Sequence, residues 1–155
     1  MKRYLPTAIL AVLCAGCDPG YFYRPVNEAG VPMSRQEIEV RGVTVSLGEF
    51  ETLSGSGSIA QQLTIKNNAS VDVILLAGTF RSRQNSIAVQ LPGDGELEWR
   101  TVPAGESKEV YCLVDLSEAG GNAEASLDTS LTWEWDIQIG DEKRTIPMKM
   151  VRVHY

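Results

Sequence analysis

Histidine and cysteine, two of the residue types that most often serve catalysis or metal binding, are scarce in this 155-residue chain. The only histidine is His154, and the cysteines are Cys14, Cys17 and Cys112. Metal centres and acid–base or nucleophilic catalysis need several imidazole, thiolate or carboxylate groups that converge on one point. A single imidazole predicts neither, and no serine lies in a nucleophile motif. We therefore expect no catalytic residue, no metal and no cofactor.

Two pairs of carboxylates stand two residues apart in the chain: Glu96 with Glu98, and Glu134 with Asp136. The second pair alternates with Trp133 and Trp135, and carboxylates beside tryptophans suggest sugar binding or glycoside hydrolysis. Residues two apart on a strand share a face, so these tryptophans face away from the carboxylates. The pattern favours tryptophans in the core and carboxylates on a solvated face, with an exposed aromatic platform as the alternative.

Two loop-like stretches offer weak ligand signals. The segment Ser54–Ser58 (SGSGS) lacks the lysine and the following helix of a phosphate cradle. In residues 115–129 the acidic groups lack the spacing of a calcium-binding EF-hand loop, because Ser117 and Ala119 occupy two of the ligand places. This second stretch predicts either a long loop or a short helical turn near 123–127.

Strand periodicity dominates the chain from residue 38 onward. The strongest signal is the apolar alternation from Leu131 to Ile139, and Gly140-Asp141 predicts a tight hairpin into a last strand. The alternation predicts further strands near residues 38–50 (broken at Gly42), 63–66, 71–76 (covered on both faces), 87–91, 97–101 and 110–114. Seven or eight short strands without a convincing amphipathic helix indicate an all-β antiparallel sandwich.

The alternation slips in the last strand, 144–154. Ile146, Met148 and Met150 share one parity, whereas Val151 and Val153 share the other. One extra residue restores a single buried face, so we expect a β-bulge near Met150-Val151. Pro147 fits only an edge strand or a disturbed ladder.

With that bulge, Lys149, Arg152 and His154 share an outward face, beside Lys143 and Arg144 at the hairpin. Such a basic interaction stripe could contact anionic headgroups or an acidic partner. The alternative is that these charges merely protect an edge strand from unwanted pairing.

The first seventeen residues have the layout of a secretory signal. Lys2 and Arg3 precede an apolar run, 5–13, and small residues precede Cys17. The run is too short to span a bilayer, which takes about 20 residues. The ending resembles the lipobox of bacterial lipoproteins, although Cys14 stands where that pattern usually has leucine. The alternative is an ordinary cleaved signal.

The lipobox resemblance implies removal of residues 1–16, the signal peptide, and attachment of lipid such as palmitate to Cys17. The chain would then be anchored to the bilayer of the cell envelope, with its domain in the periplasm or outside the cell. Asp18 resembles the signal that retains enterobacterial lipoproteins in the inner membrane, which leaves the choice between inner and outer membrane open.

Loss of Lys2 and Arg3 leaves 12 basic residues against 20 acidic ones, a formal charge of −8. Nucleic acid is excluded as a partner, because its binding requires clustered lysine and arginine. With Cys17 lipidated, Cys112 has no disulfide partner. Val110 and Val114 place it on an apolar face, where a cysteine acts as a small hydrophobe rather than a reactive thiol.

Residues 17–36, which begin with the lipidated Cys17, predict a flexible tether rich in proline and glycine. Its aromatic run Tyr21-Phe22-Tyr23 would either lie among lipid headgroups or fold back onto the domain. The remaining domain, 37–155, contains three runs similar to immunoglobulin-like modules of bacterial envelope proteins: 63–68, 71–76 and 102–107. That resemblance implies an immunoglobulin-like β-sandwich.

Together these features predict a non-enzymatic structural or protein-interaction role in the envelope, toward an unidentified envelope protein. A small-ligand or carbohydrate-binding periplasmic module is the alternative, and a hydrolase is the last candidate.

Overall fold

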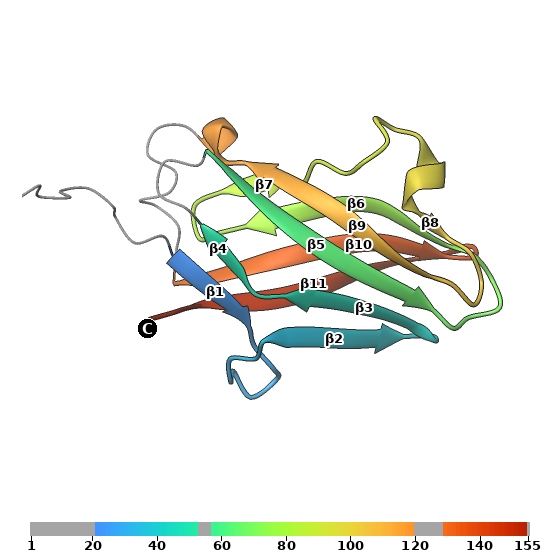
Figure 1. Cartoon of the computed structure of the whole chain (residues 1–155), viewed down its shortest axis with the longest axis horizontal. Helices are drawn as coiled ribbons and strands as arrows, with labels where there is room; N and C mark the ends of the chain where they lie inside the picture. Colours follow the sequence, from blue (N-terminus) through green and yellow to red (C-terminus); the bar gives the residue numbers. More distant parts are fainter. Residues whose placement is uncertain (1–20, 53–56, 120–128, 155) are drawn as a thin grey trace, which may run out of the picture.

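The computed structural model describes residues 21–52, 57–119 and 129–154, which form two antiparallel β-sheets (Figure 1). The first sheet has the order β4 (Phe50–Thr52), β1 (Tyr21–Pro25), β11 (Glu142–Val153), β10 (Ser130–Ile139), β6 (Val73–Arg81) and β7 (Ser86–Ala88), and β8 (Thr101–Val102) also pairs with β6. The second sheet has the order β2 (Arg35–Val40), β3 (Val43–Gly48), β5 (Ser58–Asn67) and β9 (Ser107–Asp115). Two short 3-10 helices are η1 (Leu97–Arg100) and η2 (Leu116–Ala119).

The two sheets share one hydrophobic core, so the predicted all-β antiparallel fold with sandwich-like layers is confirmed. At its centre Trp133 and Trp135 are fully buried and stack with ring centroids 5.4 Å apart. Phe80 meets Trp133 edge-on, with the ring centroids 5.0 Å apart. Gly78 lies directly opposite Trp135 across the β6–β10 ladder, and a Cβ at that glycine would come within 2.7 Å of the indole. The prediction that the tryptophans belong to the core is therefore confirmed.

The sheets are tied together along two corners. Beyond β7, Gln90 and Leu113 of β9 exchange main-chain hydrogen bonds of 2.7 and 3.0 Å. At another corner, β3 continues through Glu49 into β4, which pairs with β1 of the first sheet. Strand β2 takes part in neither link, and it remains at the edge of the second sheet.

The aromatic run at residues 21–23 belongs to the fold rather than to a tether. Strand β1 pairs with β11 from Phe22–Val153 to Pro25–Met150, and on its other side with β4. Tyr23 is fully buried and stacks on Phe50 with centroids 5.1 Å apart. The predicted tether of residues 17–36 is thus wrong from Tyr21 onward, because burial of this aromatic surface stabilises the ordered strand.

The predicted bulge near Met150-Val151 is wrong. Strand β11 keeps an unbroken register with β10 from Glu142–Ile139 to Val151–Ser130. The shift in parity has another cause: Val153 is half-buried on the outer face because it lies directly opposite Phe22 of β1. The irregularity in this sheet lies in β6 instead, where Leu76 is the extra residue opposite Asp136 and Ile137 of β10.

The hairpin at Gly140-Asp141 is confirmed, and it explains Pro147. In a two-residue hairpin the closing pair, here Ile139 and Glu142, is hydrogen-bonded, and bonded pairs alternate with non-bonded ones. The main-chain groups of Pro147 therefore face away from β10, toward the side where β1 has already ended at Pro25. Strand β11 lies between β1 and β10, so it is not an edge strand, but Pro147 lies past the end of β1 and its ring costs no ladder hydrogen bond.

Two other predicted strands differ from the structure. Residues 97–101 form mainly η1, because Gly93, Asp94 and Gly95 all have positive φ and turn the chain before it. Leu97 and Trp99 consequently lie 46% and 59% exposed. The strand predicted at 71–76 starts only at Val73 and is fully covered on one face, the other face carrying half-buried Ile74 and Leu76.

Candidate functional site

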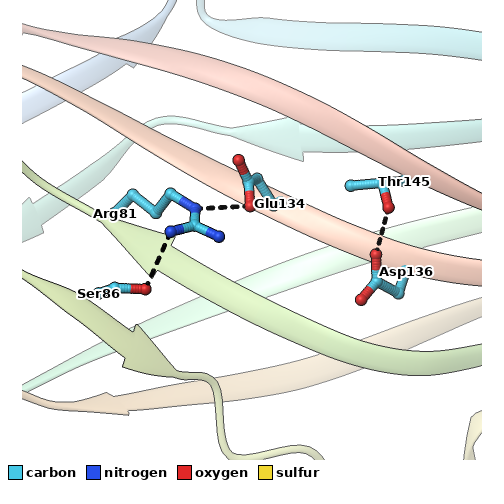
Figure 2. Close-up of polar contacts among 5 residues, drawn as sticks. All are labelled: Arg81, Ser86, Glu134, Asp136 and Thr145. Carbon is cyan, nitrogen blue, oxygen red and sulfur yellow. Dashed lines mark hydrogen bonds and ion pairs between the residues drawn. The ribbon is translucent and has the colours of Figure 1, made fainter.

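The carboxylates beside the tryptophans lie on the outer face of the first sheet, where each already has a partner (Figure 2). Arg81 Nε lies 2.6 Å from Glu134 Oε2, and its Nη1 donates to Ser86 Oγ at 3.2 Å. Thr145 Oγ1 donates to Asp136 Oδ1 at 2.5 Å. Both tryptophan rings lie on the opposite face, in the core. The arrangement supplies a polar outer face and no acid–base pair.

The predicted basic stripe is divided between two faces. Without a bulge, Lys149 points outward, whereas Arg152 follows the parity of the buried Met150. Arg152 packs its guanidinium over the ring of Tyr21, 4.5 Å from the centroid. At the hairpin, Arg144 forms an ion pair with Glu142. His154 is exposed and lies beyond the end of β11. Lys149, Arg152 and His154 therefore do not form one surface, which corrects the prediction.

Cys112 lies in the core, as its neighbours predict. Its side chain is 3% exposed, and burial raises its pKa from the ordinary value of 9.0 to about 12. Because the thiolate is the nucleophile, such a thiol reacts slowly with alkylating reagents. In the unfolded chain the thiol ionises at the lower value, so we expect the stability of the fold to fall as the pH rises above about 9.

This burial predicts a labelling result. In a chain with Cys14→Ala and Cys17→Ala, Cys112 is the single thiol. At about pH 8, alkylation by iodoacetamide should be slowed by on the order of 10³-fold relative to a free thiol, because the thiolate fraction falls by that factor. The same sample in concentrated guanidinium chloride should react at the ordinary rate. Rapid labelling of the folded chain, followed by mass spectrometry, would contradict the buried position.

Within the described ranges, no group of three or more His, Cys, Asp or Glu side chains is arranged to hold a metal ion. None of the helices in those ranges has the length or apolarity needed to cross a bilayer. The signal peptide 1–16, Cys17, Asp18 and the possible helical turn near 123–127 lie outside the described residues.

The strongest candidate site is a groove of about 680 Å³ beside the edge strand β2. Three segments line it: the loop of residues 26–33, residues 36–39 of β2, and Pro147 with Lys149 of β11. The loop is held in place by a Met33 N–H that donates to Pro25 O at 2.7 Å and by a bridge between Val26 and Pro32. We call this site the β2 groove.

The main chain of β2 offers free hydrogen-bonding groups along the β2 groove. Arg41 and Gly42 both have positive φ, 51° and 81°, and form a two-residue turn that makes Val40–Val43 the closing, hydrogen-bonded pair with β3. Bonded pairs alternate with non-bonded ones along the ladder. The alternation turns the N–H and C=O groups of three residues away from β3: Arg35, Glu37 and Glu39.

The side chains of the β2 groove combine negative charge with apolar surface. Glu28, Glu37 and Glu39 line it, and Lys149 is the only basic side chain among the described residues of its lining. Met33 is 38% exposed there, beside half-buried Ile38. Gln36 Oε1 is buried and accepts no hydrogen bond from the residues that the structure describes. Sequence reasoning missed the β2 groove because its walls come from segments far apart in the chain.

Comparison with known proteins shows a similar fold but indicates no function. No protein-family model matches the chain, and no curated protein sequence is significantly similar to it. A solved structure, described as a functionally unknown protein from Listeria monocytogenes EGD-e, superposes with a TM-score of 0.52 at 12% identity, over 77% of this chain and 82% of that chain. At this identity the likeness establishes a shared two-sheet, all-β fold.

Proposed function

We propose that this chain is a lipid-anchored protein of the bacterial envelope whose immunoglobulin-like β-sandwich has a non-enzymatic role in binding another envelope protein. The observation that carries the proposal is the sequence ending Ala15-Gly16-Cys17, which follows a basic start and an apolar run. Acylation with more than one chain at Cys17 gives stable attachment, since each buried methylene contributes about 0.8 kcal/mol. Asp18 resembles the inner-membrane retention signal of enterobacterial lipoproteins, and the proposal leaves the choice between inner and outer membrane open.

The position of the β2 groove supports an interaction role for an anchored domain. The chain enters the described fold at Tyr21, and β1 runs from there to Pro25, a length of roughly 17 Å. The loop that lines the β2 groove begins at Val26, directly after the far end of β1. The end of β1 that leads toward Cys17 is therefore the end opposite to the groove.

Replacement of Cys17 tests the anchor. Cys17→Ala should block processing, leave the full-length precursor and abolish incorporation of radioactive palmitate, because the acyl-accepting thiol is gone. Cys14→Ala is the matched control, since it removes the neighbouring cysteine of the signal and should leave cleavage and labelling intact. Normal cleavage and labelling of the Cys17→Ala chain would contradict the lipoprotein assignment.

A further inference from the structure

We propose that the β2 groove binds an extended, basic peptide segment of a partner protein, which adds to β2 as an extra strand. The inference rests on the proposed interaction role and names the chemistry of the partner. It depends on the open edge of β2, on the charge of the groove, and on its apolar floor.

The open edge supplies the affinity common to any added strand. The outward N–H and C=O groups of Arg35, Glu37 and Glu39 can pair with the main chain of a peptide, as in other cases of strand addition. Charged side chains often protect an edge from such pairing. On β2 this protection is one-sided, because it acts against acidic or neutral strands and favours a basic one.

The charge of the groove selects a basic occupant. Glu37 and Glu39 lie two apart on the outer face of β2, so lysines at alternate peptide positions would stand directly opposite them. Glu37 Oε1 is shared with Arg35, 3.6 Å away, and with Ser46 Oγ at 3.3 Å. Within the described residues, Glu39 and Glu28 form no ion pair, and they leave net negative charge to be matched by the peptide.

The other face of the added strand would meet Ile38 and Met33. Apolar residues between the lysines would cover these two partly exposed side chains. The expected ligand is therefore a short segment that alternates lysine with valine or threonine.

A second copy of the chain fits the β2 groove less well. Antiparallel pairing of two β2 strands about Glu37 places that carboxylate opposite its own copy, and like charges in direct opposition destabilise a strand pair. The formal charge of −8 on the mature chain adds to this repulsion. Dimerisation through β2 is accordingly an outcome that the test must detect.

The test is a titration of the full mature chain with a fluorescein-labelled peptide that alternates lysine with valine and threonine. We expect saturable binding with a dissociation constant below about 1 mM. In NMR spectra of the chain, changes in amide chemical shift should be confined to residues 26–40 and 145–149. Glu39→Lys should weaken binding by about tenfold or more, whereas Glu109→Lys, on the exposed outer face of β9 in the same sheet, should weaken it less than twofold. A peptide with glutamate in place of lysine should not bind.

Two further variants test the main-chain bonds. Glu37→Pro removes an outward N–H, and Glu37→Gln keeps it while removing the same charge. The proline variant should bind at least fivefold more weakly than the glutamine variant. If Glu37→Pro fails to fold, as judged by circular dichroism, N-methylation of the peptide at alternate amides tests the same bonds from the partner side and should abolish binding.

Three results would overturn the proposal: no binding of the lysine peptide at about 1 mM, equal weakening by Glu39→Lys and Glu109→Lys, or dimerisation of the chain through β2 in sedimentation experiments. The peptide titration does not depend on the lipid. Its failure would leave the Cys17 labelling result unchanged, and a failure of the lipid labelling would leave the peptide result unchanged.

Discussion

Asn67→Leu should destabilise the domain by about 3 kcal/mol or more and lower Tm by on the order of 10 °C. Asn67 is fully buried at the end of β5, and its amide joins three segments of main chain. Its Nδ2 donates to Val71 O at 2.8 Å and to Val102 O at 2.9 Å, and its Oδ1 accepts from Ala69 N at 2.9 Å. Leucine would leave all three groups without this partner.

The size of the effect is set by these orphaned groups. A buried polar group that loses its partner costs about 1–3 kcal/mol, and a domain of this size has only about 5–15 kcal/mol in total. The main chain of Asn67 makes two more bonds, to Glu106 O and from Gly105 N, so the same residue also fixes the turn before β9. Loss of the amide should therefore loosen the loop before β6 and that turn together.

Two variants separate the amide from other effects. Asn67→Asp keeps the shape and the acceptor for Ala69 but directs an oxygen at two carbonyl oxygens, so it should lose nearly as much stability as leucine. Asn68→Ala changes an exposed neighbour and should cost less than about 0.5 kcal/mol. Urea denaturation followed by circular dichroism measures all three. Equal losses for Asn67→Leu and Asn68→Ala would contradict the role of the buried amide.

Trp133→Ala should destabilise the domain by about 3–5 kcal/mol. The indole is fully buried and contacts three aromatic rings: Trp135 at 5.4 Å, Phe80 at 5.0 Å and Phe50 at 5.9 Å between centroids. Its Nε1 has no hydrogen-bond partner among the described residues, so truncation also removes one unsatisfied donor, and we expect the loss to fall in the lower half of this range.

Trp99→Ala is the matched control, because it removes the same side chain from an exposed site. Trp99 is 59% exposed on η1, and its Nε1 donates to Glu96 Oε2 at 3.3 Å. Its loss should cost less than about 1 kcal/mol. Denaturant midpoints from circular dichroism avoid the change in fluorescence that either substitution causes. A Trp133→Ala chain as stable as Trp99→Ala would show that the stacked pair is not the centre of the core.

The sequence predicted those parts of the fold where a single strand carries its own pattern. The alternation from Leu131 to Ile139 placed β10, the hairpin after it and the burial of both tryptophans. The apolar alternation gave a wrong prediction where the burial of a residue depends on its neighbour in a partner strand. Val153 lies opposite Phe22 of β1, which accounts for its apolar side chain. No residue close to Val153 in the sequence indicates that pairing.

The sequence pattern also failed to predict elements that are short or that combine distant segments of the chain. Strand β1 has five residues between stretches rich in proline and glycine, too few to establish a period of two. The β2 groove combines residues 26–39 with Pro147 and Lys149, more than 100 positions further along the chain. The strand predicted at 63–66 stops just before Asn67, and its pattern gives that residue no role. The buried role of Asn67 depends on Val102, which lies 35 residues away in the chain.

Intact mass spectrometry of the protein extracted with detergent from bacterial membranes tests the anchor most directly. We predict a mature chain that begins at Cys17, with a mass increased by two or three acyl chains on that residue. A chain that begins elsewhere, or one that begins at Cys17 but carries no acyl group, would contradict the membrane anchoring on which the proposed function depends.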